Sequence, residues 1–218
     1  MVLMVLFSLF TIVVFCSAPA FAIEETDEVI LNPNFDPADI DAWTEELLSN
    51  ADSVTPTGDF KVPQLRSTSG NWSWRDGVIC VTDSYAVFDF FNNGHAGIVA
   101  VAPHYYSTVE ANPGTGVTVV YGHWADRFTG RVYQVGVLST SVQQEYDASR
   151  WACNQIGKPY GFPIALGNRS KFYCSQLVYA AYKDTAGVNL DTAAWPGFIH
   201  PFELLDTRNV KITYSRIP

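Results

Sequence analysis

The sequence predicts an α+β domain in which helices cover one face of an antiparallel sheet. Three observations lead to this fold class. Strand-type segments dominate from Trp74 to about Leu138, and two segments of helical type follow them. The 218 residues, 48% hydrophobic and 16% charged, suit one globular domain preceded by a targeting segment.

The first 22 residues have the composition of a secretory signal peptide. They contain no charged side chain, are apolar from Val2 to Phe15, and end in the small-x-small pattern Ala20-Phe21-Ala22. We expect cleavage after Ala22 and a secreted or cell-envelope location. An uncleaved membrane anchor is the alternative, because the start lacks the usual Lys or Arg.

Residues 23–70 form an acidic N-terminal extension in which one short helix is predicted. Asp36-Pro37 matches an N-cap followed by proline at the first helical position. Apolar residues then recur at helical spacing, namely Ile40, Trp43 and Leu47. The helix is expected to end near Ser49. Residues 51–70 are rich in Ser, Thr, Pro and Gly and predict a surface loop or linker.

The predicted strands lie between residues 77 and 137 and are separated by turn-type residues. They are Gly77–Val81, Val87–Phe91, Gly97–Val101, Tyr105–Glu110, Val117–Tyr121 and Arg131–Val137. Consecutive short strands joined by turns predict an antiparallel meander.

Two helices are predicted after the strands. The first opens at Ser141 or Asp147 and continues to Ile156. The second extends from about Cys174 to Ala186, with Gly187 at the position that a helix C-cap prefers. A helical turn at residues 200–205 and a last strand at residues 210–214 complete the chain.

Net charge limits the partners of this protein. The charge of −9 belongs to the residues beyond the signal segment, because that segment carries no charged side chain. Nucleic acid and anionic membrane surfaces repel an acidic domain and are therefore not expected as partners. The oligomeric state is left open.

Three cysteines remain beyond the signal segment, and an odd number leaves at least one thiol without an internal partner. A disulfide between Cys80 and Cys153 is one open arrangement. Cysteine and histidine pairs at metal-ligand spacing are absent from the sequence, so a zinc site is not expected.

Cys174 lies at a position where a reactive thiolate is favoured. It opens the second predicted helix, and its spacing to Leu177, Val178 and Ala181 puts it on the apolar stripe that faces the sheet. Backbone N–H groups at a helix N-terminus stabilise a thiolate and can bind an oxyanion. The alternative is that Cys174 is only a small buried apolar side chain.

His95 and Glu110 are the partners that the strand pattern brings near each other. Small residues flank His95 and leave room for a second backbone or a substrate beside the imidazole. If a hairpin through residues 102–104 joins the two strands, the carboxylate of Glu110 returns beside His95 and can orient it. The alternatives are a histidine at a surface strand end and a glutamate in a solvent-facing turn.

These segments together resemble the permuted branch of the NlpC/P60 superfamily of papain-like cysteine hydrolases, the YiiX/YebB-like or DUF830 group. The matching segments are Asp76-Gly77-Val78-Ile79, Gly94-His95-Ala96-Gly97-Ile98-Val99, Ile156-Gly157-Lys158-Pro159-Tyr160-Gly161 and Tyr173-Cys174-Ser175-Gln176-Leu177-Val178-Tyr179. The histidine strand precedes the cysteine helix, as in the permuted branch. The resemblance implies a circularly permuted papain-like fold over residues 71–218.

The same resemblance implies roles for the three residues. Cys174 would be the nucleophile, His95 the general base and Glu110 the orienting third residue, with His104 as the reserve candidate. The implied enzyme is an exported cysteine amidase or endopeptidase that cleaves peptide bonds in peptidoglycan stem peptides through a thioester. The implied reaction needs neither a metal nor an organic cofactor. Aromatic residues are candidates for a substrate cleft or for the core, namely Trp72, Trp74, Trp124, Tyr160 and Trp195.

Two other functions remain open at this point. A permuted papain-like site can also act on lipid amides or esters as a hydrolase or acyltransferase, which predicts an apolar acyl channel. A non-catalytic cell-wall interaction domain, with Cys174 merely buried, predicts no labelling by a thiol-reactive probe.

Overall fold

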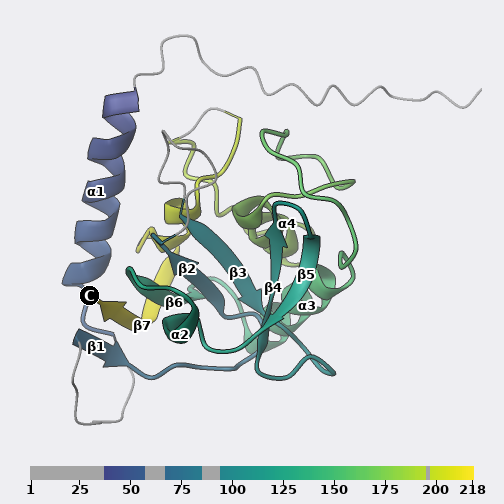
Figure 1. Ribbon diagram of the computed structural model, residues 1–218, viewed down its shortest axis with the longest axis horizontal. Coiled ribbons are helices and arrows are strands. Elements are labelled where there is room, and N and C mark those ends of the chain that lie inside the picture. The colour runs from purple at the N-terminus through teal and green to yellow at the C-terminus, as the bar shows by residue number, and fades with distance from the viewer. Residues whose placement is uncertain (1–36, 57–66, 85–93, 195–196) are drawn as a thin grey trace, which may run out of the picture.

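A seven-stranded antiparallel sheet forms the centre of the molecule, and helices pack against it (Figure 1). The computed structural model describes residues 37–56, 67–84, 94–194 and 197–218. The predicted α+β class is confirmed. The signal segment and the predicted strand 87–91 lie outside the described residues.

The strands have the order β1-β7-β6-β2-β3-β4-β5 in the sheet. Their bounds are Ser67–Gly70 (β1), Ile79–Thr82 (β2), His95–Val99 (β3), Ser107–Asn112 (β4), Gly116–Tyr121 (β5), Val132–Val137 (β6) and Val210–Ile217 (β7). Strands β2 to β5 form an antiparallel meander as predicted, but β6, which was predicted to continue the meander, is not next to β5. After β5 the chain crosses back, so β6 pairs with the other edge of β2 and β7 then pairs with β6.

The helices surround this sheet. Their bounds are Pro37–Ser53 (α1), Trp124–Arg127 (α2), Val142–Cys153 (α3), Cys174–Ala186 (α4) and the 3₁₀ helix Pro201–Leu205 (η1). The side chains of α3, α4, η1 and α1 join one large core, whereas α2 contributes Trp124 to a smaller cluster. Within the described ranges, no helix has both the length and the apolarity needed to cross a bilayer.

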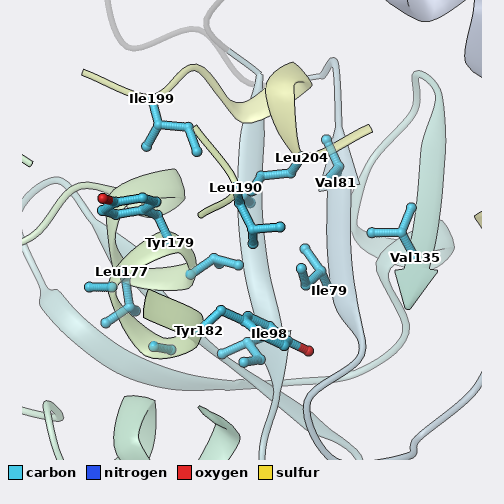
Figure 2. Packing of buried hydrophobic residues seen from close by; sticks show 14 of the residues in the cluster. Ile79, Val81, Ile98, Val135, Leu177, Tyr179, Tyr182, Leu190, Ile199 and Leu204 are labelled. Carbon is cyan, nitrogen blue, oxygen red and sulfur yellow. The ribbon is translucent and has the colours of Figure 1, made fainter. Parts of the chain in front are cut away.

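The two cores lie on opposite faces of the sheet because side chains alternate along a strand. In β3, Ala96 and Ile98 belong to the large core, while Val99 belongs to the smaller cluster. Figure 2 shows Leu177 and Tyr182 of α4 on the large-core side with Ile98. With both faces covered, every residue of β3 is buried.

Helix α4 has the ends that its sequence predicts. Gly187 caps the C-terminus in the left-handed conformation, with φ of 70°. At the N-terminus, Tyr173 is the N-cap residue but makes no side-chain capping bond. The first-turn N–H groups are therefore not satisfied by the N-cap side chain, which matters because Cys174 is the first residue of the helix.

Several local predictions differ from the structure, among them the helix predicted to continue to Ile156, which ends at Cys153. Helix α1 extends to Ser53, beyond the expected end near Ser49, and residues 67–70, expected in a loop, form edge strand β1 against β7. The open Cys80–Cys153 disulfide does not form, since both thiols are free. Cys80 packs in the small cluster, whereas Cys153 packs against the large core on the other face of the sheet.

Candidate active site

Cys174 lies at the start of α4 with its thiol directed to β3. The side chain is 7% exposed. Burial raises the pKa of the thiol, but a hydrogen bond with His95, the charge of that imidazole, and backbone bonds from Ala96 and Ser175 together lower the pKa below its ordinary value. A thiol held this way is activated toward its thiolate, which is the nucleophilic form.

His95 is the first residue of β3 and lies between the thiol and a carboxylate. Its Nε2 is 2.8 Å from Oε2 of Glu110, so Nδ1 is the ring nitrogen that remains for the thiol. Burial alone lowers the pKa of the imidazole. Hydrogen bonds with Cys174 and Glu110, together with the charges of both groups, outweigh burial and raise the pKa to about 9.

Glu110 lies on β4, which pairs with β3 as the predicted hairpin requires. Its side chain is completely buried. Burial raises the pKa of the carboxyl, but bonds from His95 and Arg127 and their positive charges lower it to about 2. The carboxylate is therefore charged at every pH at which the protein would function.

The structure thus brings the three predicted residues into one hydrogen-bonded chain. The reserve candidate His104 is half-buried in the β3–β4 connection, where its backbone N–H donates to Val101. It is Glu110 that bonds the ring of His95. The order thiol, imidazole, carboxylate is the order that nucleophilic acyl transfer uses.

Three further residues surround Glu110, and the sequence analysis named only Trp124 among them, as a candidate for the cleft or the core. Arg127 donates from Nη1 to Oε1 at 2.7 Å and from Nη2 to Oε2 at 2.9 Å. The hydroxyl of Thr108 donates to Oε1, and Nε1 of Trp124 donates to that hydroxyl at 3.2 Å. The position of Thr108 could have been predicted from the sequence, because it lies two positions from Glu110 and therefore on the same face of β4.

Gly97 explains how the carboxylate and the indole come so close to the histidine strand. A Cβ at this position would lie 2.8 Å from Cγ of Glu110 and 3.0 Å from Cζ2 of Trp124. Trp124 stacks on His95 with ring centroids 5.4 Å apart and an interplanar angle of 8°. The small residue beside His95 therefore makes room for these two side chains, and not for a substrate.

An apolar pocket opens beside the nucleophile. The empty space in this pocket, including the part that is open to solvent, is about 310 Å³. Its lining consists of Tyr160, Phe162, Tyr173, Cys174, Ser175, Phe198, Ile199, His200 and Pro201. Two hydroxyls of the lining bond the backbone of Ile199. The Tyr173 hydroxyl accepts from the Ile199 N–H at 3.0 Å, and the Ser175 hydroxyl donates to the Ile199 carbonyl at 2.7 Å.

The aromatic side chains expected in a cleft divide between pocket and core. Tyr160 lines the pocket. Trp124 is fully buried, and Trp72 and Trp74 pack against the small cluster on the other face. Trp195 lies outside the described residues. The described residues contain no group of three or more His, Cys, Asp or Glu side chains that could hold a metal ion.

A histidine strand that precedes a cysteine helix, with the two meeting across an antiparallel sheet, defines a permuted papain-like hydrolase fold. A family model described as "permuted papain-like amidase enzyme, YaeF/YiiX, C92 family" matches residues 76–197, which is more than half of the chain. The protein belongs to this family. Placement in the NlpC/P60 superfamily or the DUF830 group stays a prediction.

A solved structure shares the fold. The chain is similar to the metalloprotein yiiX from Escherichia coli O157:H7, with a TM-score of 0.54 and 18% sequence identity. The similarity covers 67% of this chain and 100% of that chain. Comparison with curated proteins finds no match. The word metalloprotein describes the relative, and the residues described in this chain do not provide a fitting set of ligands.

Proposed function

We propose that this protein is an exported cysteine amidase that cleaves its substrate through a thioester on Cys174. The hydrogen-bonded chain from Cys174 through His95 to Glu110, at a helix N-terminus without a side-chain cap, is the observation that carries the proposal. Membership in a family of permuted papain-like amidases supports the same reaction class.

The geometry supports the following sequence of steps. His95 takes the thiol proton, and the thiolate attacks the carbonyl carbon of the amide. Backbone N–H groups in the first turn of α4 hold the resulting oxyanion. His95 then gives its proton to the departing amine, which leaves a thioester. Water, deprotonated by His95, attacks the thioester and releases the carboxylic acid, and the thiol is regenerated.

Glu110 acts on this cycle through the imidazole. Its carboxylate bonds Nε2, so the neutral ring carries its hydrogen there and keeps Nδ1 as the base for the thiol. When the ring becomes an imidazolium, the buried negative charge stabilises it. In this state the imidazolium lies between the thiolate of Cys174 and the carboxylate of Glu110, and the site is ready for attack.

The first substrate proposed is the stem peptide of bacterial peptidoglycan. The predicted signal peptide would deliver the enzyme to the cell envelope, and the amide bonds of stem peptides lie there. The acidic charge of the chain fits a substrate that is neither nucleic acid nor an anionic membrane surface.

The pocket favours a second substrate class, in which the acyl group is apolar. Its described lining is dominated by aromatic and aliphatic side chains, and Cys174 is part of that lining. An acyl group placed there would bury apolar surface while its carbonyl meets the thiol. An amide or ester of a lipid-like acid is thus the alternative, with hydrolysis or acyl transfer as the outcome.

One experiment compares these substrates. Mature protein is incubated with purified peptidoglycan and, separately, with N-acyl amides of increasing chain length, and the products are identified by mass spectrometry. Release of stem-peptide fragments supports the first substrate, and release of acyl chains supports the second. Cys174→Ala should abolish either activity, and Cys153→Ala is the matched control for loss of a thiol.

The same preparations test the non-catalytic alternative. Cys174 in an activated site should be alkylated by iodoacetamide near neutral pH faster than Cys80, whose buried thiol has a raised pKa. An inert Cys174, together with identical products from the mature protein and Cys174→Ala, would exclude the proposed mechanism.

A further inference from the structure

Arg127 binds both carboxylate oxygens of Glu110, including Oε2, which also bonds the ring of His95. It is the last residue of α2, and its guanidinium engages both carboxylate oxygens, at 2.7 and 2.9 Å. Glu110 is completely buried, whereas the side chain of Arg127 is 22% exposed. Two parallel N–H···O bonds fix the plane of the carboxylate as well as its position.

The guanidinium itself is held by aromatic rings. Its Cζ lies 5.6 Å from the ring centroid of Trp124 and 5.1 Å from that of Phe128. Trp124 also stacks on His95. The four-residue helix α2 therefore supplies both the indole that stacks on His95 of β3 and the guanidinium that binds Glu110 of β4.

The charges around Glu110 balance only when Arg127 is counted. The facing groups are His95 on β3, Arg127 on α2 and the Cys80 thiol on β2, with the neutral hydroxyl of Thr108 on β4 itself. In the reactive state Cys174 is an anion, His95 a cation and Glu110 an anion. Without Arg127 this buried group would carry a net negative charge, which is costly away from water.

We propose that Arg127 is a positioning residue that keeps Glu110 ionised and aimed at His95 throughout the reaction. This inference rests on the proposed function, because it assigns a role within the same site. Arg127 touches none of the reacting atoms in the proposed steps. It acts on the thiol through Glu110 and then through His95.

Loss of Arg127 should change the reactivity of Cys174 at acidic pH. Arg127 and His95 together lower the pKa of Glu110. Removal of the guanidinium raises that pKa, so Glu110 takes up a proton in the mildly acidic range. His95 then loses its negative partner, and the thiolate of Cys174 loses the imidazolium that stabilises it.

The test measures the rate of Cys174 alkylation by iodoacetamide between pH 4 and pH 10, in the full chain, with site-resolved mass spectrometry. It needs no knowledge of the substrate. The variants are Arg127→Met, which removes the charge, and Arg127→Lys, which keeps it. Arg131→Met is the matched control, because Arg131 is 29% exposed and pairs with Asp52 and Asp83, away from the triad.

At pH 5, Arg127→Met should react about tenfold more slowly than the unmodified protein, which corresponds to an upward shift of the acid limb by about one unit. Arg127→Lys should recover most of this loss, and Arg131→Met should show none. If Arg127→Met does not fold, as judged by circular dichroism, Arg127→Gln takes its place and should show the same shift.

Two results would overturn the inference. The first is an unchanged acid limb of the alkylation profile in a folded variant that lacks the Arg127 charge. The second is an alkylation rate that changes by the same factor at every pH, since that result indicates only a structural role. Failure of the proposed function gives a different result. In that case the unmodified protein itself would show the pH profile of an ordinary thiol, before any comparison of variants.

Discussion

Two buried histidines lie in the region of Cys174, and their environments shift their pKa values in opposite directions. His95 hydrogen-bonds the thiol, while His200 lines the apolar pocket beside it. Their exposed fractions are 1% and 2%. Yet the pKa of His95 is raised to about 9, whereas burial lowers the pKa of His200 to about 3.

The difference comes from where the neighbouring glutamate binds. Glu110 bonds the ring of His95, so the imidazolium has a partner. Glu203 accepts instead from the backbone N–H groups of His200 and Thr192, at 2.7 and 2.9 Å. The Nδ1 atom of His200 accepts from Phe202 N–H at 3.2 Å, as an N-cap. Burial alone therefore selects the neutral ring at His200.

The two glutamates differ in the same way as their histidines. Contact with His95 and Arg127 lowers the pKa of Glu110 to about 2 against the effect of burial. Burial raises the pKa of Glu203 to about 7, although Thr192 and the backbone donate hydrogen bonds to it. The comparison shows that burial by itself does not give an imidazole a raised pKa. A carboxylate hydrogen-bonded to the ring raises the pKa, and this contact distinguishes His95, the proposed base, from His200, which serves as an N-cap.

The largest expected effect comes from exchanging each imidazole for an amide. His95→Asn removes the base and should lower kcat about 10³- to 10⁴-fold, since a nucleophile without its base retains little activity. His200→Asn keeps an N-cap acceptor for the η1 helix, and should change kcat by less than about tenfold. Steady-state kinetics on whichever substrate the proposed product analysis identifies gives both values. Equal losses would mean that the two histidines do not differ in function.

Neutralising the glutamates should give the next largest difference. Glu110→Gln keeps the shape of the side chain but removes its charge, so kcat should fall at least about 10²-fold. The pKa of His95 should then fall from about 9, and the alkaline limb of the pH profile should move to lower pH.

Glu203→Gln is the control for that experiment. Glu203 accepts hydrogen bonds from the backbone N–H groups of His200 and Thr192. Its variant should leave the alkaline limb in place, with kcat within about threefold of the unmodified protein. A shift of the limb in Glu203→Gln would show that the ring of His200 participates in the reaction.

The stability of the protein should depend on pH with opposite signs for the two histidines. The pKa of His95 is raised above 6.5, so its contribution is complete below pH 6.5 and is lost as pH rises through about 9. The pKa of His200 is lowered, so stability falls as pH decreases from 6.5 toward about 3. The two contributions amount to at most about 3 kcal/mol for His95 and about 5 kcal/mol for His200.

Urea unfolding measured across both pH ranges separates these contributions. His95→Asn should flatten the decline between pH 7 and pH 10, and His200→Asn should flatten the decline between pH 6.5 and pH 4. Each variant should leave the other range nearly as it was. A variant that flattens both ranges would indicate that the two imidazoles titrate together.

The sequence predicted the parts of this site that depend on local pattern. Helical spacing after Cys174 and the glycine at 187 placed the thiol at the start of a helix, and that helix is α4. Strand alternation and a short turn placed Glu110 opposite the histidine strand. Both inferences use periodicities that operate within a few residues, and the structure agrees with both.

The sequence did not predict the parts that depend on long-range packing. Arg127 and Trp124 belong to a four-residue helix, too short to give a periodic signal, and it lies on the face of the sheet opposite the other helices. The polar residues 67–70 carry no strand pattern, yet they form β1 because β7 offers an edge to pair with. Partners far apart in sequence decide such elements.

The smallest expected effect tests the space that lets Glu110 approach His95. In Gly97→Ala the new methyl group would meet Cγ of Glu110 at 2.8 Å and Trp124 at 3.0 Å, so the carboxylate or the indole must move. The free energy of unfolding should decrease by about 1–3 kcal/mol, and kcat should fall about tenfold through misalignment of the carboxylate.

Gly167→Ala is the matched control, because no atom lies within 4 Å of its added Cβ. Urea unfolding and kinetics on both variants measure the two effects. Loss of stability with unchanged kcat would mean that Glu110 tolerates displacement, and the close contact between carboxylate and imidazole would then matter less than the charge it supplies.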